Sequence, residues 1–295
     1  MLKRSLVFTS PAVLALKNKQ LVISFKEVPT EKVTVPIEDI GFVLIDNPLV
    51  SITIPLLNAL SESNVAVVFC DAKGMPTSMM QNFDNNLLQG ENIQNQISAT
   101  ETLKKNLWKQ TIESKIKNQT ALLNKLGKNG DLLKPYYKNV KSGDSNNREG
   151  IAARIYFQEL FGKNFTRDRF LSGTNLLLNY GYTIIRSATA RAIMSTGLFP
   201  AFGIFHHNRS NAFPLADDLM EPYRPFVDEI VFDLQKDHSL ELNKASKEKI
   251  IRVLFCDTYF PKITRPLEVA LSYTMSSVAR CFNKEQKIIS YPTLK

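Results

Sequence analysis

The sequence predicts an α+β protein, with a small β-rich N-terminal domain followed by a larger, all-helical C-terminal domain. Short segments rich in β-branched residues fill most of the first 71 residues, whereas from about residue 91 apolar residues recur at helical spacing. The change of period falls near Gly74 and Pro76, two residues that commonly interrupt regular structure. We therefore expect a β domain at 1–72, a linker at 73–90 and a helical domain at 91–295.

Within the β domain, we expect six strands and one short helix. Alternation is clearest at 20–26, where Leu21, Ile23 and Phe25 share one face. The first apolar stretch resembles a signal peptide, but Pro11 interrupts it and another alternating segment follows directly, so we interpret it as strands. The predicted strands are 4–10, 12–18, 20–26, 31–37, 40–46 and 65–71, and the helix is 52–64.

In the helical domain, a long amphipathic stretch carries apolar residues on one face from Ile97 to Leu123 and lysines on the other. The loop at 141–149 is rich in Asp, Ser and Asn, which can cap the helix that follows at 149–160. The next helix begins after Gly173 and ends at Gly197, which suits the position just past a helix end. Shorter helices are predicted at 214–221, 225–235, 246–256 and 265–282.

The composition excludes several classes of protein. Of the 295 residues, 44% are hydrophobic and 22% are charged, so collagen-like and wholly disordered chains are excluded. The three cysteines are scattered and form no CxxC pair, which argues against a disulfide framework or a zinc ribbon and favours a reducing cytoplasm. No apolar run is long enough to span a bilayer, so we expect no membrane-spanning segment.

The positive charge is concentrated in one block. The net charge is +9, and between Glu101 and Lys141 there are ten lysines and only three acidic residues. A solvated helical face explains any single lysine, but a block of about forty residues with such an excess of positive charge predicts a polyanionic partner. Nucleic acid is the first candidate and an anionic membrane the second.

Glu149 is the first candidate site residue. It opens a helical stripe whose other positions, at i+3, i+4, i+7, i+8 and i+11, are all apolar, so its carboxylate should face inward with them. The alternative is a first-turn glutamate that the helix dipole favours.

A second candidate site lies between residues 203 and 229. Two of the three histidines, His206 and His207, are adjacent there, and Asp217, Asp218 and Glu221 follow at spacings that can share a helix face. So many like charges would repel one another unless a cation neutralised them, and carboxylates with imidazole suit magnesium or manganese better than zinc. The alternative is a solvated acidic turn beside an incidental histidine pair.

The helix that begins after Gly173 also contains polar residues among its apolar ones. Hydrogen bonding between buried helices explains most of them, and the two arginines could instead contact phosphate. The residues are Asn175, Asn179, Tyr180, Tyr182, Arg186 and Arg191.

Two long motifs, NNREGIAARIYFQELFG and NLLLNYGYTIIRSATARAIMSTGLFPAFGIFHHNRSNAFPLADDLMEPYRP, give the chain a family resemblance. The sequence resembles the CRISPR-associated adaptation endonuclease/integrase ("Cas-one") family, most closely its type II members, over nearly its whole length. The family has an N-terminal β domain and a C-terminal helical domain, in agreement with the periodicity.

The resemblance also implies site residues. The glutamate of the family's metal triad falls on Glu149, its histidine on His206 and its acidic residue on Glu221. These three would bind Mg²⁺ or Mn²⁺ and carry out catalysis. Asp218 could be an auxiliary ligand or lie just behind the ligands, because the family varies near the third position.

The resemblance further implies the function and the partners. Members insert short foreign DNA fragments into a CRISPR array, each 3′-hydroxyl attacking a phosphodiester of the repeat by transesterification. The implied partners are double-stranded DNA (the captured fragment and the repeat), a second copy of the chain joined through the N-terminal β domain, and a small "Cas-two" dimer. Type II relatives also work with Cas-nine and, in some subtypes, with a ring-forming protein. The setting would be a prokaryotic cytoplasm.

Two other functions remain open from the sequence. One is a metal-dependent nuclease that cuts branched DNA without joining strands, since the same site would serve both reactions. The other is a DNA-binding scaffold without catalysis, in which the three residues form a buried polar network. Only analysis of reaction products separates these alternatives.

Overall fold

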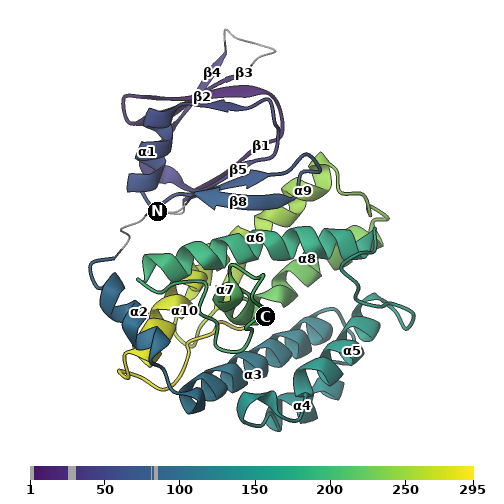
Figure 1. Cartoon of the computed structure of the whole chain (residues 1–295). Coiled ribbons are helices and arrows are strands. Elements are labelled where there is room, and N and C mark those ends of the chain that lie inside the picture. Colours follow the sequence, from purple (N-terminus) through teal and green to yellow (C-terminus); the bar gives the residue numbers. More distant parts are fainter. Residues whose placement is uncertain (1–2, 26–30, 81, 83–85) are drawn as a thin grey trace. The chain divides into compact units, whose positions relative to one another are not determined.

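The computed structural model describes residues 3–25, 31–80, 82 and 86–295, and it divides into two compact units, Met1–Asn85 and Asn86–Lys295. The first unit is rich in strands and the second is mostly helical, which confirms the predicted α+β class (Figure 1). Part of the predicted linker, residues 81 and 83–85, lies outside the described residues, as does Lys26 at the end of a predicted strand.

The described residues of the first unit form two four-stranded sheets and one α-helix (Figure 1). One sheet has the order β1-β5-β7-β8, with β1, β5 and β7 parallel and β8 antiparallel. The other has the order β4-β3-β2-β6, antiparallel except where β2 meets β6. The elements are β1 Arg4–Phe8, β2 Ala12–Lys17, β3 Gln20–Phe25, β4 Lys32–Pro36, β5 Ile40–Ile45, β6 Ser51–Ile52, α1 Ile54–Glu62, β7 Ala66–Cys70 and β8 Pro76–Met80.

The turn between β2 and β3 fixes the register of that hairpin. Asn18 and Lys19 both have positive φ, as the two central residues of a type I′ turn require. The turn pairs Leu16 with Leu21 and Leu14 with Ile23, so these apolar side chains lie near one another across the strands. Leu21 and Ile23 are buried, which confirms the face predicted from alternation.

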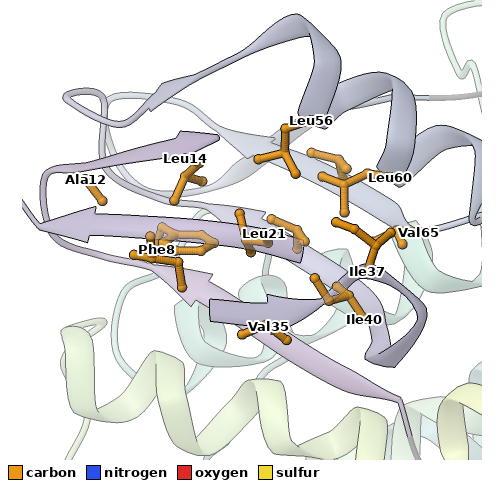
Figure 2. Packing of buried hydrophobic residues seen from close by; sticks show 13 residues of the cluster. Phe8, Ala12, Leu14, Leu21, Val35, Ile37, Ile40, Leu56, Leu60 and Val65 are labelled. Carbon is orange, nitrogen blue, oxygen red and sulfur yellow. The ribbon is translucent and has the colours of Figure 1, made fainter. Parts of the chain in front are cut away.

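The core of the first unit lies between the two sheets and α1. Leu14 and Leu21 from one sheet, Ile40 from the other, and Leu56 and Leu60 from α1 all belong to the same buried cluster (Figure 2). Each of these side chains is at most 1% exposed. Burying apolar surface at about 25 cal/mol per Å² makes this cluster the main source of stability for the unit.

The second unit contains a long helix, α6, that is buried along most of its length. It packs against α7, α8, α9 and α10, while α3 packs against α5 and two short 3₁₀ turns, η3 and η4. The helices are α2 Gln89–Ile97, α3 Glu101–Lys125, α4 Lys134–Lys138, α5 Arg148–Phe161, α6 Thr174–Ser195, α7 Pro214–Leu219, α8 Arg224–Lys236, α9 Lys244–Ile251 and α10 Leu267–Phe282. The 3₁₀ turns are η1 Ile37–Asp39 in the first unit and η2 Gly130–Leu133, η3 Ser142–Asp144, η4 Glu221–Tyr223 and η5 Arg252–Phe255 in the second.

Several details differ from the sequence prediction, which includes neither β6 nor α4. The stretch from Ile97 to Leu123 is not one helix, because the helix breaks between the end of α2 at Ile97 and the start of α3 at Glu101. The Thr100 side chain caps α3 by accepting a hydrogen bond from the Leu103 amide at 3.2 Å. Strand β8 lies in the predicted linker, and a small hairpin, β9 Asp257–Tyr259 with β10 Thr264–Pro266, interrupts the helical domain. Strands β6, β9 and β10 have only two or three residues, too few for alternation to be visible, and β8 begins at Pro76, which the sequence marks as an interruption.

Candidate active site

Glu149 lies in the first turn of α5 and is held there by the loop before it. The Asp144 carboxylate accepts hydrogen bonds from the backbone amides of Arg148 at 2.8 Å and Glu149 at 3.1 Å. Both amides lack partners within the helix, so Asp144 supplies the cap predicted for this loop. The Glu149 side chain is thereby directed toward α3.

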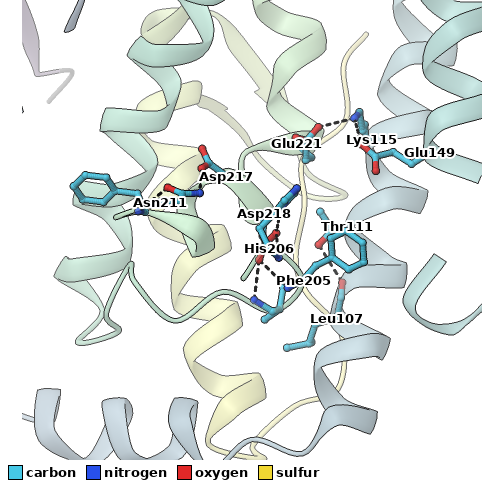
Figure 3. Close-up of polar contacts among 12 residues, drawn as sticks. Leu107, Thr111, Lys115, Glu149, Phe205, His206, Asn211, Asp217, Asp218 and Glu221 are labelled. Carbon is cyan, nitrogen blue, oxygen red and sulfur yellow. Dashed lines mark hydrogen bonds and ion pairs between the residues drawn. The ribbon is translucent and has the colours of Figure 1, made fainter. Parts of the chain in front are cut away.

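The Lys115 side chain of α3 lies between Glu149 and Glu221. Its Nζ is 2.6 Å from Glu149 Oε1 and 2.6 Å from Glu221 Oε2 (Figure 3). The bond to Glu149 has good hydrogen-bond geometry, whereas Glu221 Oε2 has the ion pair but no hydrogen bond among the described residues. Two carboxylates from different elements therefore converge on one cationic atom.

Glu221 has a second cation on its other oxygen. Arg224 NH2 is 2.8 Å from Glu221 Oε1, and the guanidinium also stacks over the Tyr182 ring at 4.5 Å from its centroid. The backbone of η4 is tied to α3, because Asn118 Nδ2 donates to the Pro222 carbonyl at 2.8 Å. Glu221 is thus fixed both through its backbone and through its side chain.

His206 lies in the loop between α6 and α7, and Asp218 of α7 holds it. Asp218 Oδ1 accepts from the His206 ring Nδ1 at 2.5 Å and from the His206 amide at 3.2 Å. Asp218 Oδ2 accepts from the amides of Ile204 at 2.7 Å and Phe205 at 3.0 Å. Because Nδ1 is engaged, Nε2 is the ring nitrogen left for a ligand.

This arrangement requires a glycine in the loop. A Cβ at Gly203 would lie 2.6 Å from the His206 carbonyl oxygen and 2.9 Å from Asp218 Oδ2. Since neither backbone nor a fully buried carboxylate can move cheaply, only glycine lets the loop wrap closely around Asp218.

Aromatic rings support the same loop from α3. Phe205 stacks on Trp108 with centroids 4.3 Å apart and planes 3° apart, and His206 meets the Trp108 ring edge-on at 5.7 Å. Trp108 is fully buried, whereas the His206 side chain is 45% exposed. The imidazole is therefore supported on one side and open to solvent on the other.

The charges shift the pKa values of the site in the directions expected for ion pairs. The positive charge of Lys115 lowers the pKa of Glu149, and the hydrogen bond to Asp218 raises the pKa of His206. For Lys115, burial alone would lower the pKa, but the two carboxylates outweigh it and the pKa is raised. Glu149 is ionised and Lys115 protonated at neutral pH.

The sequence analysis missed two residues of this cluster. Lys115 was counted with the lysine block, yet it occupies the apolar face of α3, three residues after Ile112 and seven after Trp108. That spacing is the signal that could have identified it as a buried lysine. For Arg224 the signal was its position three residues after Glu221 at the end of the second motif, a spacing at which a glutamate and an arginine can pair.

Asp217 faces away from this cluster. Its carboxylate pairs with Arg186 at 2.6 Å, and Arg191 pairs with Glu268 at 3.0 Å. Asn175 and Asn179 both accept hydrogen bonds from Arg167. The polar residues of α6 thus serve internal bonding, the simpler of the two interpretations offered by the sequence.

The donor atoms match a hard divalent cation in type. The site has two carboxylates that already share one cation, and an imidazole with one nitrogen free. In the part of the chain that the structure describes, however, no group of three His, Cys, Asp or Glu side chains is arranged to hold a metal ion. Lys115 would have to move before Glu149 and Glu221 could share a metal.

A hollow of about 410 Å³ opens beside His206. Lys104, His207 and Arg209 line it together with several amide side chains. Its cationic and hydrogen-bonding groups suit a polar, anionic ligand. Among the described helices, none is long and apolar enough to cross a membrane.

Comparison with solved structures defines the class of fold. A casposase bound to its integration product has a TM-score of 0.80 at 21% identity, over 98% of this chain and 93% of that one. A Cas1 protein from Thermotoga maritima has a TM-score of 0.74 at 16% identity, over 97% of this chain and 99% of that one. At these identities the matches establish the fold alone, a β-rich unit followed by a helical one.

Sequence comparison establishes the family. A family model described as CRISPR associated protein Cas1 matches residues 6–266. A CRISPR-associated endonuclease Cas1 from Neisseria meningitidis serogroup C is 37% identical over 255 residues, which are 85% of this chain and 83% of the relative. A relative of the same description from Francisella tularensis subsp. novicida is 28% identical over 267 residues, 81% of each chain. The chain belongs to the Cas1 family of CRISPR-associated endonucleases, as the two motifs predicted.

Proposed function

We propose that this protein joins the 3′ ends of short DNA fragments to a CRISPR array by transesterification, with a divalent metal held by Glu149, His206 and Glu221. The observation that carries the proposal is the convergence of the Glu149 and Glu221 carboxylates on the Lys115 ammonium. The His206 ring is hydrogen-bonded through Nδ1, which leaves its Nε2 for a ligand. Membership of the Cas1 family supports the same class of chemistry.

In this proposal Glu149 and Glu221 supply anionic oxygen ligands, and His206 supplies a neutral nitrogen through Nε2. Mg²⁺ or Mn²⁺ bound there would neutralise charge on the attacked phosphate and favour ionisation of the attacking hydroxyl. In this proposal Asp218 lies behind the ligands, since its two oxygens accept hydrogen bonds from three amides and the His206 ring. Its task is to orient the imidazole.

The reaction needs no external energy source, because one phosphodiester replaces another. The 3′-oxygen of the fragment forms a bond to phosphorus, the bond from phosphorus to the 3′-oxygen of the repeat strand breaks, and the proton lost by the first oxygen is balanced by one gained by the second. The contribution of the protein is to position the strands and to stabilise negative charge. Arg224, which is already paired with Glu221, keeps that carboxylate in place.

The partners follow from the relatives and from the charge. Similar structures include a casposase bound to integration product and a Cas6-RT-Cas1–Cas2 complex. We infer that this chain binds double-stranded DNA, acts with a second copy of itself, and assembles with a Cas2 dimer. Cas9 and a ring-forming protein are further partners that the type II resemblance suggests.

The test uses the purified full chain, a labelled branched DNA that mimics a half-joined fragment, and Mn²⁺. Release of the branch and resealing of the continuous strand are followed together on a denaturing gel. We expect resealed strands that disappear with a chelator and with His206→Ala. The matched control is His207→Ala, because His207 is the exposed neighbour of His206 and lacks the bond to Asp218.

Each other outcome contradicts the proposal in a different way. Nicked but unsealed strands would indicate a nuclease that only cuts. DNA binding without any product, even after a Cas2 dimer is added, would indicate a scaffold without catalysis. Full activity in the presence of a chelator would exclude the metal.

A further inference from the structure

We propose that Lys115 is an internal cation that occupies the place of the metal between Glu149 and Glu221, and that a divalent metal enters this site only by displacing the Lys115 ammonium. The inference rests on the proposed function, since it assumes that these two glutamates bind the metal. It assigns to Lys115 the control of metal affinity.

The geometry supports displacement because the ammonium and a metal would compete for the same oxygens. Lys115 Nζ is 2.6 Å from one oxygen of each glutamate, and a hard divalent cation would need to approach the same two oxygens at about 2.0–2.6 Å. The two cations cannot both fit between Glu149 and Glu221. The Lys115 side chain is 8% exposed, so the ammonium is held inside the protein.

The charges of the cluster support the same conclusion. Lys115 and Arg224 carry two positive charges, and Glu149 and Glu221 carry two negative ones, so the partly buried cluster is neutral without a metal. Adding a divalent ion to a neutral, partly buried cluster is unfavourable unless a positive charge leaves or an anion enters. Arg224 is anchored by its stacking on Tyr182, whereas no aromatic ring among the described residues lies under the ammonium of the flexible Lys115 side chain.

A consequence is that metal and DNA should bind together. Once the ammonium is displaced, the site with its metal is positively charged, and a DNA phosphate is the anion that neutralises it. Metal affinity would then be weak in the free protein and would rise when DNA is bound, and by reciprocity DNA affinity would rise with metal. The lysine would thus keep the nuclease site free of metal until a substrate is present.

The test measures Mn²⁺ affinity by calorimetry in the full chain without DNA. Lys115→Met removes the competing cation, so we expect the Kd for Mn²⁺ to fall by about tenfold or more. Without metal, the same variant should have a lower melting temperature than the wild type. Adding Mn²⁺ should raise the melting temperature of the variant by more than it raises that of the wild type. Lys117→Met is the matched control, because Lys117 is exposed on the same helix, and it should bind Mn²⁺ as the wild type does.

A second measurement needs no destabilising variant. A buried ammonium exchanges its protons slowly, so Lys115 should give a ¹H–¹⁵N signal in the metal-free protein, assigned by its absence in Lys115→Arg. Saturating Mg²⁺ should shift or abolish that signal.

The outcomes separate this inference from the proposed function. Saturable Mn²⁺ binding that Glu149→Gln removes, combined with an unchanged or weaker affinity in Lys115→Met, overturns the inference alone, as does an ammonium signal that Mg²⁺ leaves unchanged. If neither the wild type nor Lys115→Met shows binding that depends on Glu149, both the inference and the metal of the proposed function fail.

Discussion

Asp218 holds His206 twice, through the ring nitrogen Nδ1 at 2.5 Å and through the backbone amide at 3.2 Å. The same carboxylate accepts the two preceding amides, so one buried side chain fixes both the path of the loop and the direction of the imidazole. The orientation of His206 is therefore built into the fold and does not depend on a bound metal.

The first prediction concerns Asp218→Asn. An amide has one acceptor oxygen where the carboxylate has two, so it cannot satisfy the Nδ1 proton and the three amides together. We expect strand joining to fall by about 10–100-fold and stability by about 1–3 kcal/mol. Joining assays and denaturant unfolding measure the two effects.

Asp217→Asn is the control for this variant, since Asp217 is the neighbouring acid but pairs with Arg186. It should lose far less activity than Asp218→Asn. Equal losses in the two variants would mean that this acidic turn matters only for folding.

The sequence alone predicted the class of fold and most of the helices, because amphipathic periods and caps are local signals. The loop before α5 illustrates this: its Asp, Ser and Asn residues predicted a cap, and the structure shows that Asp144 supplies it. The partners of a buried polar group are not local. Lys115 contacts Glu149, 34 residues away, and Glu221, more than 100 residues away, so its inclusion in the site depended on how α3, α5 and η4 pack.

The choice between Asp218 and Glu221 shows the same limit. From spacing, both acids can share a helix face and either could be a ligand. Both acids are buried, and they differ in their partners: Asp218 accepts hydrogen bonds from the loop around His206, whereas Glu221 lies opposite Glu149 across Lys115. No sequence pattern contains that information.

The second prediction uses the single tryptophan of the chain as a probe of the His206 loop. Phe205 covers Trp108 in a parallel stack, so Phe205→Ala should expose the indole to water and shift its fluorescence to longer wavelength. Losing the stack should cost about 1–2 kcal/mol of stability. His207→Ala, on the same loop, should leave the emission unchanged, and an identical spectrum in Phe205→Ala would contradict the stack.

The third prediction concerns the pH dependence of stability at Asp228. Burial raises the pKa of this carboxyl to about 6, although it accepts hydrogen bonds from Tyr156 at 2.7 Å and Tyr182 at 2.5 Å. The folded state therefore keeps a proton that the unfolded chain loses near pH 4, so this group lowers stability as pH rises from about 4 to about 6. The penalty should reach at most about 3 kcal/mol above pH 6.

Asp228→Asn removes that titration. The difference in unfolding free energy, wild type minus variant, should decrease between pH 4 and pH 7 and then become constant. Asp233→Asn, at an exposed position on the same helix, is the matched control. A wild-type-minus-Asp228→Asn difference that does not vary with pH would show that the carboxyl titrates normally.

The last prediction concerns the lysine block, which the structure divides into lysines with different roles. Lys115 is buried in the site, and Lys109 and Lys125 are paired with Glu113 and Glu229. Lys105, Lys138 and Lys141 are exposed, and among the described residues no ion pair is found for them, so they remain candidates for contact with DNA phosphates.

Changing Lys105, Lys138 and Lys141 together to Glu should weaken DNA binding irrespective of sequence. Each lost phosphate contact should reduce the slope of log affinity against log salt by about 0.9, so the triple variant should lose about two to three units of slope. Binding titrations at several salt concentrations measure this. The control for net charge changes three exposed lysines outside the block, Lys236, Lys244 and Lys262, together to Glu. If the triple variant kept the wild-type slope, DNA would have to bind through other groups, such as Lys104 and Arg209 in the hollow beside His206.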